Sequence, residues 1–186
     1  MAPRGRLVLL NGPTSAGKTT VSHAVAARLT TPWLLLPVDL FHQIRTRPDA
    51  DLTPREWHDV FRRTRAAYHR ALTGAVSSGC DVIGDHVLNE PWRLDDLLRL
   101  TPGLDVLLVH VTCSHAELRR REKARGDRDL GTAVVQERQV FQHGDCDLTV
   151  DTTYGPDEPA AALLELIRKP PADRAFDRLR ASRRRA

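Results

Sequence analysis

The chain has 186 residues, of which 41% are hydrophobic and 28% charged, as is ordinary for one soluble globular domain with a sizeable core. No apolar run approaches the roughly 20 residues that cross a bilayer, and the run Leu7–Leu10 is too short for a signal-peptide core. Three widely spaced cysteines, Cys80, Cys113 and Cys146, form no CxxC pair and fit a reducing compartment. We therefore expect a cytoplasmic protein without a membrane partner.

The net charge of +4 is concentrated at the C-terminus. Segment 169–186 contains seven basic and two acidic residues, so it carries +5 and the rest of the chain −1. We expect residues 1–170 to form the domain and residues 171–186 to be a basic, solvated tail. A helix docked on the domain, or an anionic partner, is the alternative for this tail. The nearly neutral body does not favour nucleic-acid binding, and the oligomeric state stays open, with a homodimer among the options.

Five short apolar runs alternate with helical patterns along the chain. Continuous apolar runs of this kind are typical of strands buried on both faces of a parallel sheet. They are Leu7–Leu10, Trp33–Val38, Asp81–Ile83, Val106–Val111 and Leu148–Val150. Helices are predicted over Thr19–Leu29, Thr53–Ser77, Pro91–Leu100, Ser114–Lys123, Thr132–Gln142 and Asp157–Ile167. This alternation predicts an α/β fold with a mostly parallel sheet.

The stretch NGPTSAGKTT, residues 11–20, lies between the first predicted strand and the first predicted helix. Its pattern Gly12-x4-Gly17-Lys18-Thr19 is that of a phosphate-binding P-loop. Glycines let the backbone N–H groups turn inward around phosphate oxygens, and the N-terminus of the next helix adds positive potential. Lys18 can reach the β- and γ-phosphates, and the Thr19 hydroxyl can bind Mg²⁺. We expect ATP to be bound by Gly12, Pro13, Thr14, Ser15, Ala16, Gly17, Lys18, Thr19 and Thr20.

The remaining motifs favour a small-molecule kinase. The chain contains neither the NKxD element of GTPases nor an LSGGQ-like signature of ABC ATPases. A kinase needs three further parts: a base for the acceptor hydroxyl, a carboxylate for the metal, and cations around the transferred phosphoryl group.

Two aspartates follow predicted strands at the edge of the sheet where ligands bind. Asp39 follows the second run and is our first candidate for a functional role at this edge, with a helix N-cap as the alternative. Asp85 follows the third run and is our candidate ligand for Mg²⁺ or its water shell, with a structural loop cap as the alternative. His86 is a further candidate contact for the acceptor, alongside Asp39 and Asp85, although a lone histidine is often a local hydrogen-bonding group.

The cations are expected in the segment ELRRREKARGDRDLG. Arg121, Arg125 and Arg128 follow the spacing i, i+4, i+7, which is one face of a helix. We expect segment 121–132 to act as a lid that brings guanidinium groups to the phosphates and excludes water. A solvated basic helix end is the alternative. The eight histidines form no close ligand set, so no transition-metal site is expected.

Together these motifs resemble the chloramphenicol phosphotransferase-like family of P-loop kinases. The segments that carry the resemblance are LNGPTSAGKTT, PWLLLPVD, CDVIGD, VLLVHVTCSHAELRRREKARGDR and DLTVDTT. The resemblance implies a three-layer sandwich with a five-stranded sheet flanked by helices. It also implies ATP- and Mg²⁺-dependent phosphorylation of a hydroxyl on an antibiotic, as in a resistance enzyme.

Carried over to this sequence, the resemblance makes Asp39 the general base, with Lys18, Arg121, Arg125 and Arg128 as catalytic cations. His86 stands where the family has a second acidic residue after the third strand. The segment after Asp39, residues 42–70, is basic and contains histidines, unlike the family pattern, and it is expected to form much of the acceptor pocket. The alternatives are a metabolic kinase of the shikimate or adenylylsulfate type, and an ATP-binding regulatory or nucleic-acid-binding module.

Overall fold

The computed structural model describes residues 4–46, 51–125 and 131–184. Its five strands form one sheet in the order β2-β3-β1-β4-β5, and each neighbouring pair is parallel. The strands are β1 (Arg6–Asn11), β2 (Leu34–Pro37), β3 (Val82–His86), β4 (Asp105–Thr112) and β5 (Leu148–Asp151). The parallel sheet predicted from the apolar runs is therefore confirmed, and all carboxyl ends of the strands lie at one edge.

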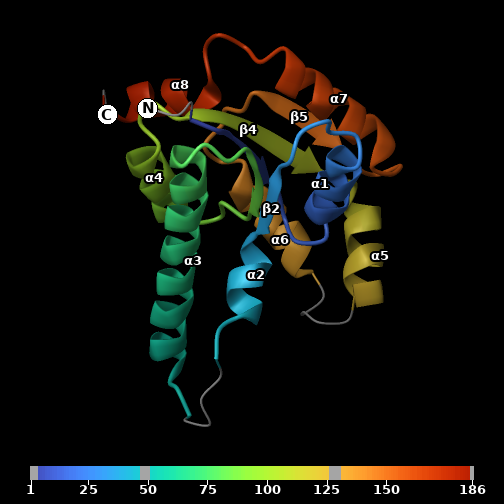
Figure 1. Cartoon of the computed structure of the whole chain (residues 1–186). Coiled ribbons are helices and arrows are strands. Elements are labelled where there is room, and N and C mark those ends of the chain that lie inside the picture. Colours follow the sequence, from blue (N-terminus) through green and yellow to red (C-terminus); the bar gives the residue numbers. More distant parts are fainter. Residues whose placement is uncertain (1–3, 47–50, 126–130, 185–186) are drawn as a thin grey trace.

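Helices cover both faces of the sheet (Figure 1). They are α1 (Lys18–Ala26), α2 (Val38–Gln43), α3 (Pro54–Ser77), α4 (Pro91–Leu100), α5 (His115–Arg125), α6 (Thr132–Val140), α7 (Asp157–Arg168) and α8 (Ala175–Arg183). Successive strand residues point to opposite faces. In β1, Leu7 and Leu9 pack with α3, α4 and α8, whereas Val8 and Leu10 pack with α1 and α7. This is the expected three-layer sandwich.

Two local features bring site residues to the sheet edge. The strand β3 continues through Asp85 to His86, further than the apolar run indicated, because both residues pair with β1. The short helix α2 begins directly after β2, so the chain turns away from the sheet at Asp39. The helix α3 starts with a capping box, in which the Thr53 side chain accepts from the Glu56 backbone and the Glu56 side chain accepts from the Thr53 backbone.

The C-terminal segment is a docked helix over residues 175–183, and the expectation of a solvated tail is wrong there. Ala175, Phe176 and Leu179 are buried in the same core cluster as α3 and α4. The arginines of this segment contact carboxylates of the chain itself, in the pairs Arg174–Asp105, Arg178–Asp145, Arg180–Asp177 and Arg183–Asp95. The positive charge that suggested an anionic partner is thus largely neutralised by carboxylates of the same chain. None of the helices in the described ranges is long and apolar enough to cross a membrane.

Candidate active site

The P-loop joins β1 to α1 by a turn that depends on its glycines. A Cβ atom on Gly12 would lie 2.3 Å from the Val111 carbonyl oxygen, so no larger residue fits there. Gly17 has a φ of 85° and Ser15 a φ of 61°, which are left-handed conformations that turn the backbone over the start of α1. The loop therefore has the conformation in which main-chain N–H groups and a helix N-terminus can meet an anion.

The Lys18 ammonium lies across this loop. Its Nζ donates to the carbonyl oxygens of Gly12 at 2.9 Å and Pro13 at 2.8 Å, and only 8% of the residue is exposed. The charge is thus held beside the carboxyl end of β1, close enough to Asp85 to favour that carboxylate's ionised form. A polyanion in the loop would find a buried cation already in place.

Asp85 and Thr19 form a pair of oxygen ligands at the start of α1. The Thr19 hydroxyl donates to Asp85 Oδ2 at 3.3 Å, and Asp85 Oδ1 accepts from the Val38 backbone N–H at 3.1 Å. Burial raises the pKa of Asp85 despite the nearby Lys18 ammonium, because a carboxylate with 7% exposure has lost most of its hydration. A hydroxyl and a buried carboxylate are ligands that suit Mg²⁺, so the residues present fit that ion.

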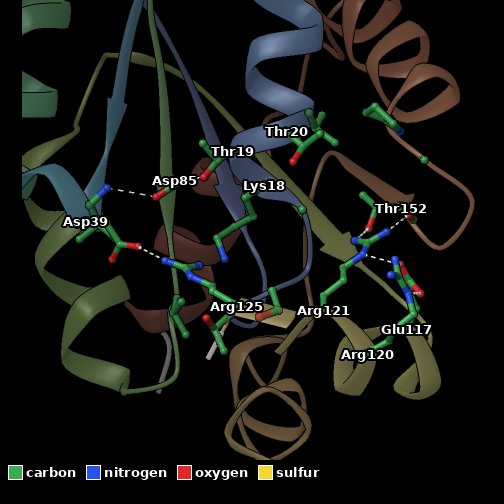
Figure 2. Close-up of a pocket in the computed structure, with 18 residues that line it drawn as sticks. Lys18, Thr19, Thr20, Asp39, Asp85, Glu117, Arg120, Arg121, Arg125 and Thr152 are labelled. Carbon is green, nitrogen blue, oxygen red and sulfur yellow. Dashed lines mark hydrogen bonds and ion pairs between the residues drawn. The ribbon is translucent and has the colours of Figure 1, made fainter. Parts of the chain in front are cut away.

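A cavity of about 380 Å³ opens above the P-loop (Figure 2). Two arginines predicted for the lid line it from α5, and the third, Arg128, lies outside the described residues. Arg121 donates to Glu117 at 2.7 Å and to the Thr152 carbonyl at 2.7 Å. Hydrogen bonds from Arg120 and Arg121 lower the pKa of Glu117 to about 2, so this carboxylate stays ionised and keeps both guanidinium groups at the cavity.

Thr152 links the P-loop to the arginine helix, a role that the sequence did not predict. Its hydroxyl donates to the Ala16 carbonyl at 2.7 Å and accepts from Arg121 Nη1 at 3.1 Å. The residue is 2% exposed and follows β5 directly. The only sequence signal was the VDTT segment after the last apolar run, which the family resemblance already included.

Asp39 and Arg125 meet at the opposite side of the cavity. Asp39 lies in the first turn of α2, whose N-cap is Pro37, so it is not the helix cap that the alternative interpretation required. Its carboxylate lies 3.6 Å from Arg125 Nη2, and both side chains are about half exposed. Figure 2 shows the pair beside Lys18 and Asp85.

A second cavity of about 550 Å³ adjoins the first. Both cavities are lined by Asp39 and Arg125, together with Val38 and Val87, so these residues form the boundary between them. The rest of its lining comes mainly from α2, α3 and the segment after β3: His42, Gln43, Arg45, Phe61, Arg65, His86, Asn89, Arg93 and Gln136. Several of these residues belong to segment 42–70, which the sequence analysis assigned to an acceptor pocket.

His86 is buried at the wall of the second cavity, with 1% exposure. Its Nδ1 accepts from the Val87 backbone N–H at 2.8 Å, so its proton resides on Nε2, which lies 2.8 Å from His69 Nε2. His69 Nδ1–H then donates to Asp96 at 2.8 Å. Burial lowers the pKa of both rings, that of His86 well below its usual value, so both are neutral. His86 therefore has the local hydrogen-bonding role that was its alternative interpretation, and it also borders the cavity.

The match to known proteins covers almost the whole chain. The family model described as chloramphenicol phosphotransferase-like protein matches residues 5–168. Two curated proteins of Mycobacterium tuberculosis, MT2714 of strain CDC 1551 / Oshkosh and Rv2636 of strain ATCC 25618 / H37Rv, carry a provisional O-phosphotransferase name. Each is 32% identical over 96% of this chain and 89% of its own length.

Similar solved structures include two kinases and one resistance protein with the same fold. The adenylylsulfate (APS) kinase CysC of M. tuberculosis has a TM-score of 0.65 at 17% identity, over 90% of this chain and 99% of that one. Shikimate kinase of Acinetobacter baumannii has a TM-score of 0.62 at 19% identity, over 93% and 97%. The tunicamycin resistance protein of Deinococcus radiodurans has a TM-score of 0.65 at 19% identity, over 88% and 96%. The fold is that of P-loop kinases, and the chain belongs to the chloramphenicol phosphotransferase-like protein family.

Proposed function

We propose that this protein transfers the γ-phosphoryl group of ATP to a hydroxyl of a small molecule. The observation that carries the proposal is the pair of adjoining cavities with Asp39 and Arg125 at their boundary. One cavity contains the P-loop, and the other is lined by side chains suited to a polar acceptor. A phosphoryl group passing from one ligand to the other would cross at this boundary.

The first cavity supplies the groups that an ATP triphosphate requires. Main-chain N–H groups of the P-loop and the Lys18 ammonium would hold the phosphates, and Thr19 and Asp85 would hold Mg²⁺. When bound, Mg²⁺ would neutralise charge on the phosphate oxygens. Arg121 and Arg125 would supply guanidinium groups to the same oxygens, and closure of α5 over the site would exclude the water that hydrolyses ATP.

Asp39 is the candidate general base. Its carboxylate would accept the proton of the acceptor hydroxyl while the hydroxyl oxygen forms its bond to the γ-phosphorus. The bond from that phosphorus to the β,γ-bridging oxygen breaks, and ADP leaves with its electron pair. The position at the boundary of the two cavities is what this role requires, whereas Asp85 is buried against Thr19 and Val38.

The family makes an antibiotic the first class of acceptor to consider, and one structural neighbour is named for tunicamycin resistance. The second candidate is a metabolic kinase, because structural neighbours with this fold include a kinase solved with APS and another solved with shikimate. The hypothesis of a nucleic-acid-binding module relied on the basic C-terminal segment. The arginines around α8 contact carboxylates of the same chain, so this segment no longer favours that hypothesis.

Calorimetry with ATP–Mg²⁺ and an acceptor screen test the proposal together. The purified protein should bind ATP–Mg²⁺, and it should release ADP faster when a suitable hydroxylated antibiotic or metabolite is added. Mass spectrometry should then find one phosphoryl group on that acceptor. Lys18→Ala should weaken nucleotide binding. Absence of ATP binding, or ADP release that no acceptor in a broad panel stimulates, would refute the proposed function.

A further inference from the structure

The second cavity carries an excess of positive charge. Of the described residues that line it, four are arginines, namely Arg45, Arg65, Arg93 and Arg125, and one is a carboxylate, Asp39. Glu90 lies nearby and binds Arg93. Even with Glu90 included, four guanidinium groups stand against two carboxylates. The histidine His86 adds no charge, because burial lowers its pKa.

These arginines do not all have equivalent surroundings. Arg125 forms an ion pair with Asp39. Arg93, which is 4% exposed, forms an ion pair with Glu90, so each of these two positive charges is paired with a carboxylate. Arg45 contacts no carboxylate in the part of the chain that the structure describes. Its Nη1 instead lies 3.3 Å from His42 Nδ1 and 3.4 Å from the Thr64 hydroxyl.

Aromatic rings hold Arg45 in place. Its guanidinium carbon lies 4.8 Å from the centre of the Phe61 ring and 5.5 Å from that of Trp57, within the range of cation–π contacts. The guanidinium of Arg65 approaches the same Phe61 ring at 5.6 Å. Stacking fixes the position of a guanidinium without neutralising it, so the charge remains available to a ligand.

Two buried nitrogen atoms of these arginines lack a hydrogen-bond acceptor in the described part of the chain. Among the described residues, four buried side-chain polar atoms lack a hydrogen-bond partner, and two of them are Arg45 Nε and Arg93 Nε. Both arginines line this cavity. A buried N–H without an acceptor is costly, and such groups are rare in native proteins. Because these two atoms are buried, they show that both guanidinium groups are incompletely hydrogen-bonded, whereas any contact with a ligand would come from other atoms of the side chains.

The residues that line the second cavity define two ends of it. Asp39 and Arg125 belong to its boundary with the nucleotide cavity, whereas Arg45, Phe61 and Arg65 line the second cavity alone. A bound acceptor that places its hydroxyl at Asp39 would therefore extend towards Arg45 and Arg65.

From this arrangement we infer that the phosphoryl acceptor carries a fixed anionic group in addition to its hydroxyl. Arg45 and Arg65 bind that group, which is a carboxylate, sulfate or phosphate, while the hydroxyl meets Asp39. The inference rests on the proposed kinase function and narrows its substrate class. An uncharged hydroxylated antibiotic would offer no negative charge to the guanidinium of Arg45.

Matched pairs of acceptors test this inference in the wild-type protein. Each pair consists of an anionic compound and its neutral counterpart: a hydroxy acid and its amide, a sugar phosphate and the free sugar, a sulfated alcohol and the corresponding diol. We expect ADP release with the anionic member of at least one pair, at a kcat/KM about tenfold or more above that of the neutral member. The pair that responds identifies the anion. Neutral members that react as well as their anionic partners would overturn the inference while leaving the kinase function standing.

Arginine variants locate the anion site. Arg45→Met and Arg65→Met should each raise KM for the preferred acceptor about tenfold or more, with a smaller change in kcat, while ATP binding is retained. Arg63→Met is the matched control, because Arg63 is exposed on the same helix as Arg65 and lines neither cavity. Equal KM values in all three variants would contradict the proposed site.

An inorganic probe tests the anion site by binding alone, without turnover of an acceptor. The protein is saturated with a non-hydrolysable ATP analogue and Mg²⁺, which occupies the P-loop, and sulfate or phosphate is then titrated. We expect these anions to raise the melting temperature of the loaded wild type and Arg63→Met, and to have a clearly smaller effect on Arg45→Met. No effect on the loaded wild type would overturn the anion site.

Discussion

Replacing Asp85 by asparagine should make the protein more stable and less active. Asp85 is 7% exposed, and burial raises its pKa even though the Lys18 ammonium opposes the shift. A raised pKa in the folded state means that the ionised carboxylate is less favourable there than in the unfolded chain. The neutral amide avoids this cost. Its oxygen can still accept from the Val38 N–H, and its NH₂ group can donate to the Thr19 hydroxyl.

The size of the effect follows from the linkage between protonation and folding. Each unit of pKa difference between the folded and unfolded states corresponds to about 1.4 kcal/mol at a pH above both values. The net upward shift of the Asp85 pKa already includes the attraction of Lys18 for the carboxylate. We therefore expect Asp85→Asn to raise the free energy of unfolding at pH 7 by about 1–2 kcal/mol, in the range of single stabilising changes. For a domain of this size, that corresponds to about 2–8 °C in Tm.

Urea unfolding as a function of pH measures this directly. Below the folded-state pKa, the wild-type carboxyl becomes protonated and neutral, so the advantage of the asparagine variant should shrink as pH falls from about 7 to about 4. ATP-dependent turnover should fall roughly 10²-fold or more, because a ligand for Mg²⁺ is lost. A variant less stable than wild type at pH 7, or a stability difference independent of pH, would refute the reasoning.

Asp147 provides a matched control. Burial also raises the pKa of Asp147, but both of its oxygens accept backbone N–H groups, from Leu108 at 2.7 Å and Ala175 at 2.8 Å. An asparagine there must direct its NH₂ group at one of those N–H donors. Asp147→Asn should therefore lose about 1–3 kcal/mol, the cost of a buried donor without an acceptor. The contrast shows that removing a buried charge stabilises the fold only where the hydrogen bonds survive.

Three further predictions follow from the site and the core. Asp39→Asn should lower kcat about 10²–10⁴-fold while calorimetry finds nearly unchanged ATP affinity, since a general base contributes to the chemical step; near-full turnover would exclude Asp39 as the base. Phe176→Ala should lower the free energy of unfolding by about 3–5 kcal/mol, because the ring is 1% exposed in the core under α8; a change below about 1 kcal/mol in urea unfolding would contradict the docked helix. Burial lowers the pKa of His69, His86, His110 and His143, that of His110 to about 4. Because the unfolded chain takes up protons near pH 6.5 and the folded chain does not, stability should fall as pH drops from about 7 to 5, by at most about 1.4 kcal/mol per pH unit for each histidine; a flat or rising stability over that range would contradict the neutral, buried histidines.

The sequence predicted the phosphate loop and the sheet because both follow from local rules. A P-loop needs its glycines, lysine and hydroxyl at fixed spacing between a strand and a helix, and all of these can be read in residues 11–20. Strands buried on both faces form continuous apolar runs, so their centres were identified. The end of β3 was placed too early, because Asp85 and His86 are polar and owe their strand conformation to pairing with β1.

Features that depend on tertiary contacts were less predictable. The hydroxyl of Thr152 binds the Ala16 carbonyl across 136 positions of the chain, and no local pattern signals such a contact. The C-terminal segment was predicted to be solvated because of its basic charge, although its apolar residues Ala175, Phe176 and Leu179 pack into the core and determine where the helix lies. Residues of segment 42–70, which was expected to form much of the acceptor pocket, line the second cavity. The stacking of Arg45 on Trp57 and Phe61 depends on α2 and α3 lying side by side, which no local pattern shows.

The ion pair between Asp39 and Arg125 connects the two cavities energetically as well as spatially. Both side chains are about half exposed, and pairs of this kind contribute roughly 0–1 kcal/mol. A triphosphate carries far more negative charge than one carboxylate, so phosphates in the first cavity would compete effectively for the guanidinium of Arg125. Under the proposed function, that competition weakens the contact of Asp39 with Arg125 and so favours a hydrogen bond from the acceptor hydroxyl to the Asp39 carboxylate. Asp39 would then be more available as a base when nucleotide is bound, which is when a proton taken from the acceptor hydroxyl leads to phosphoryl transfer.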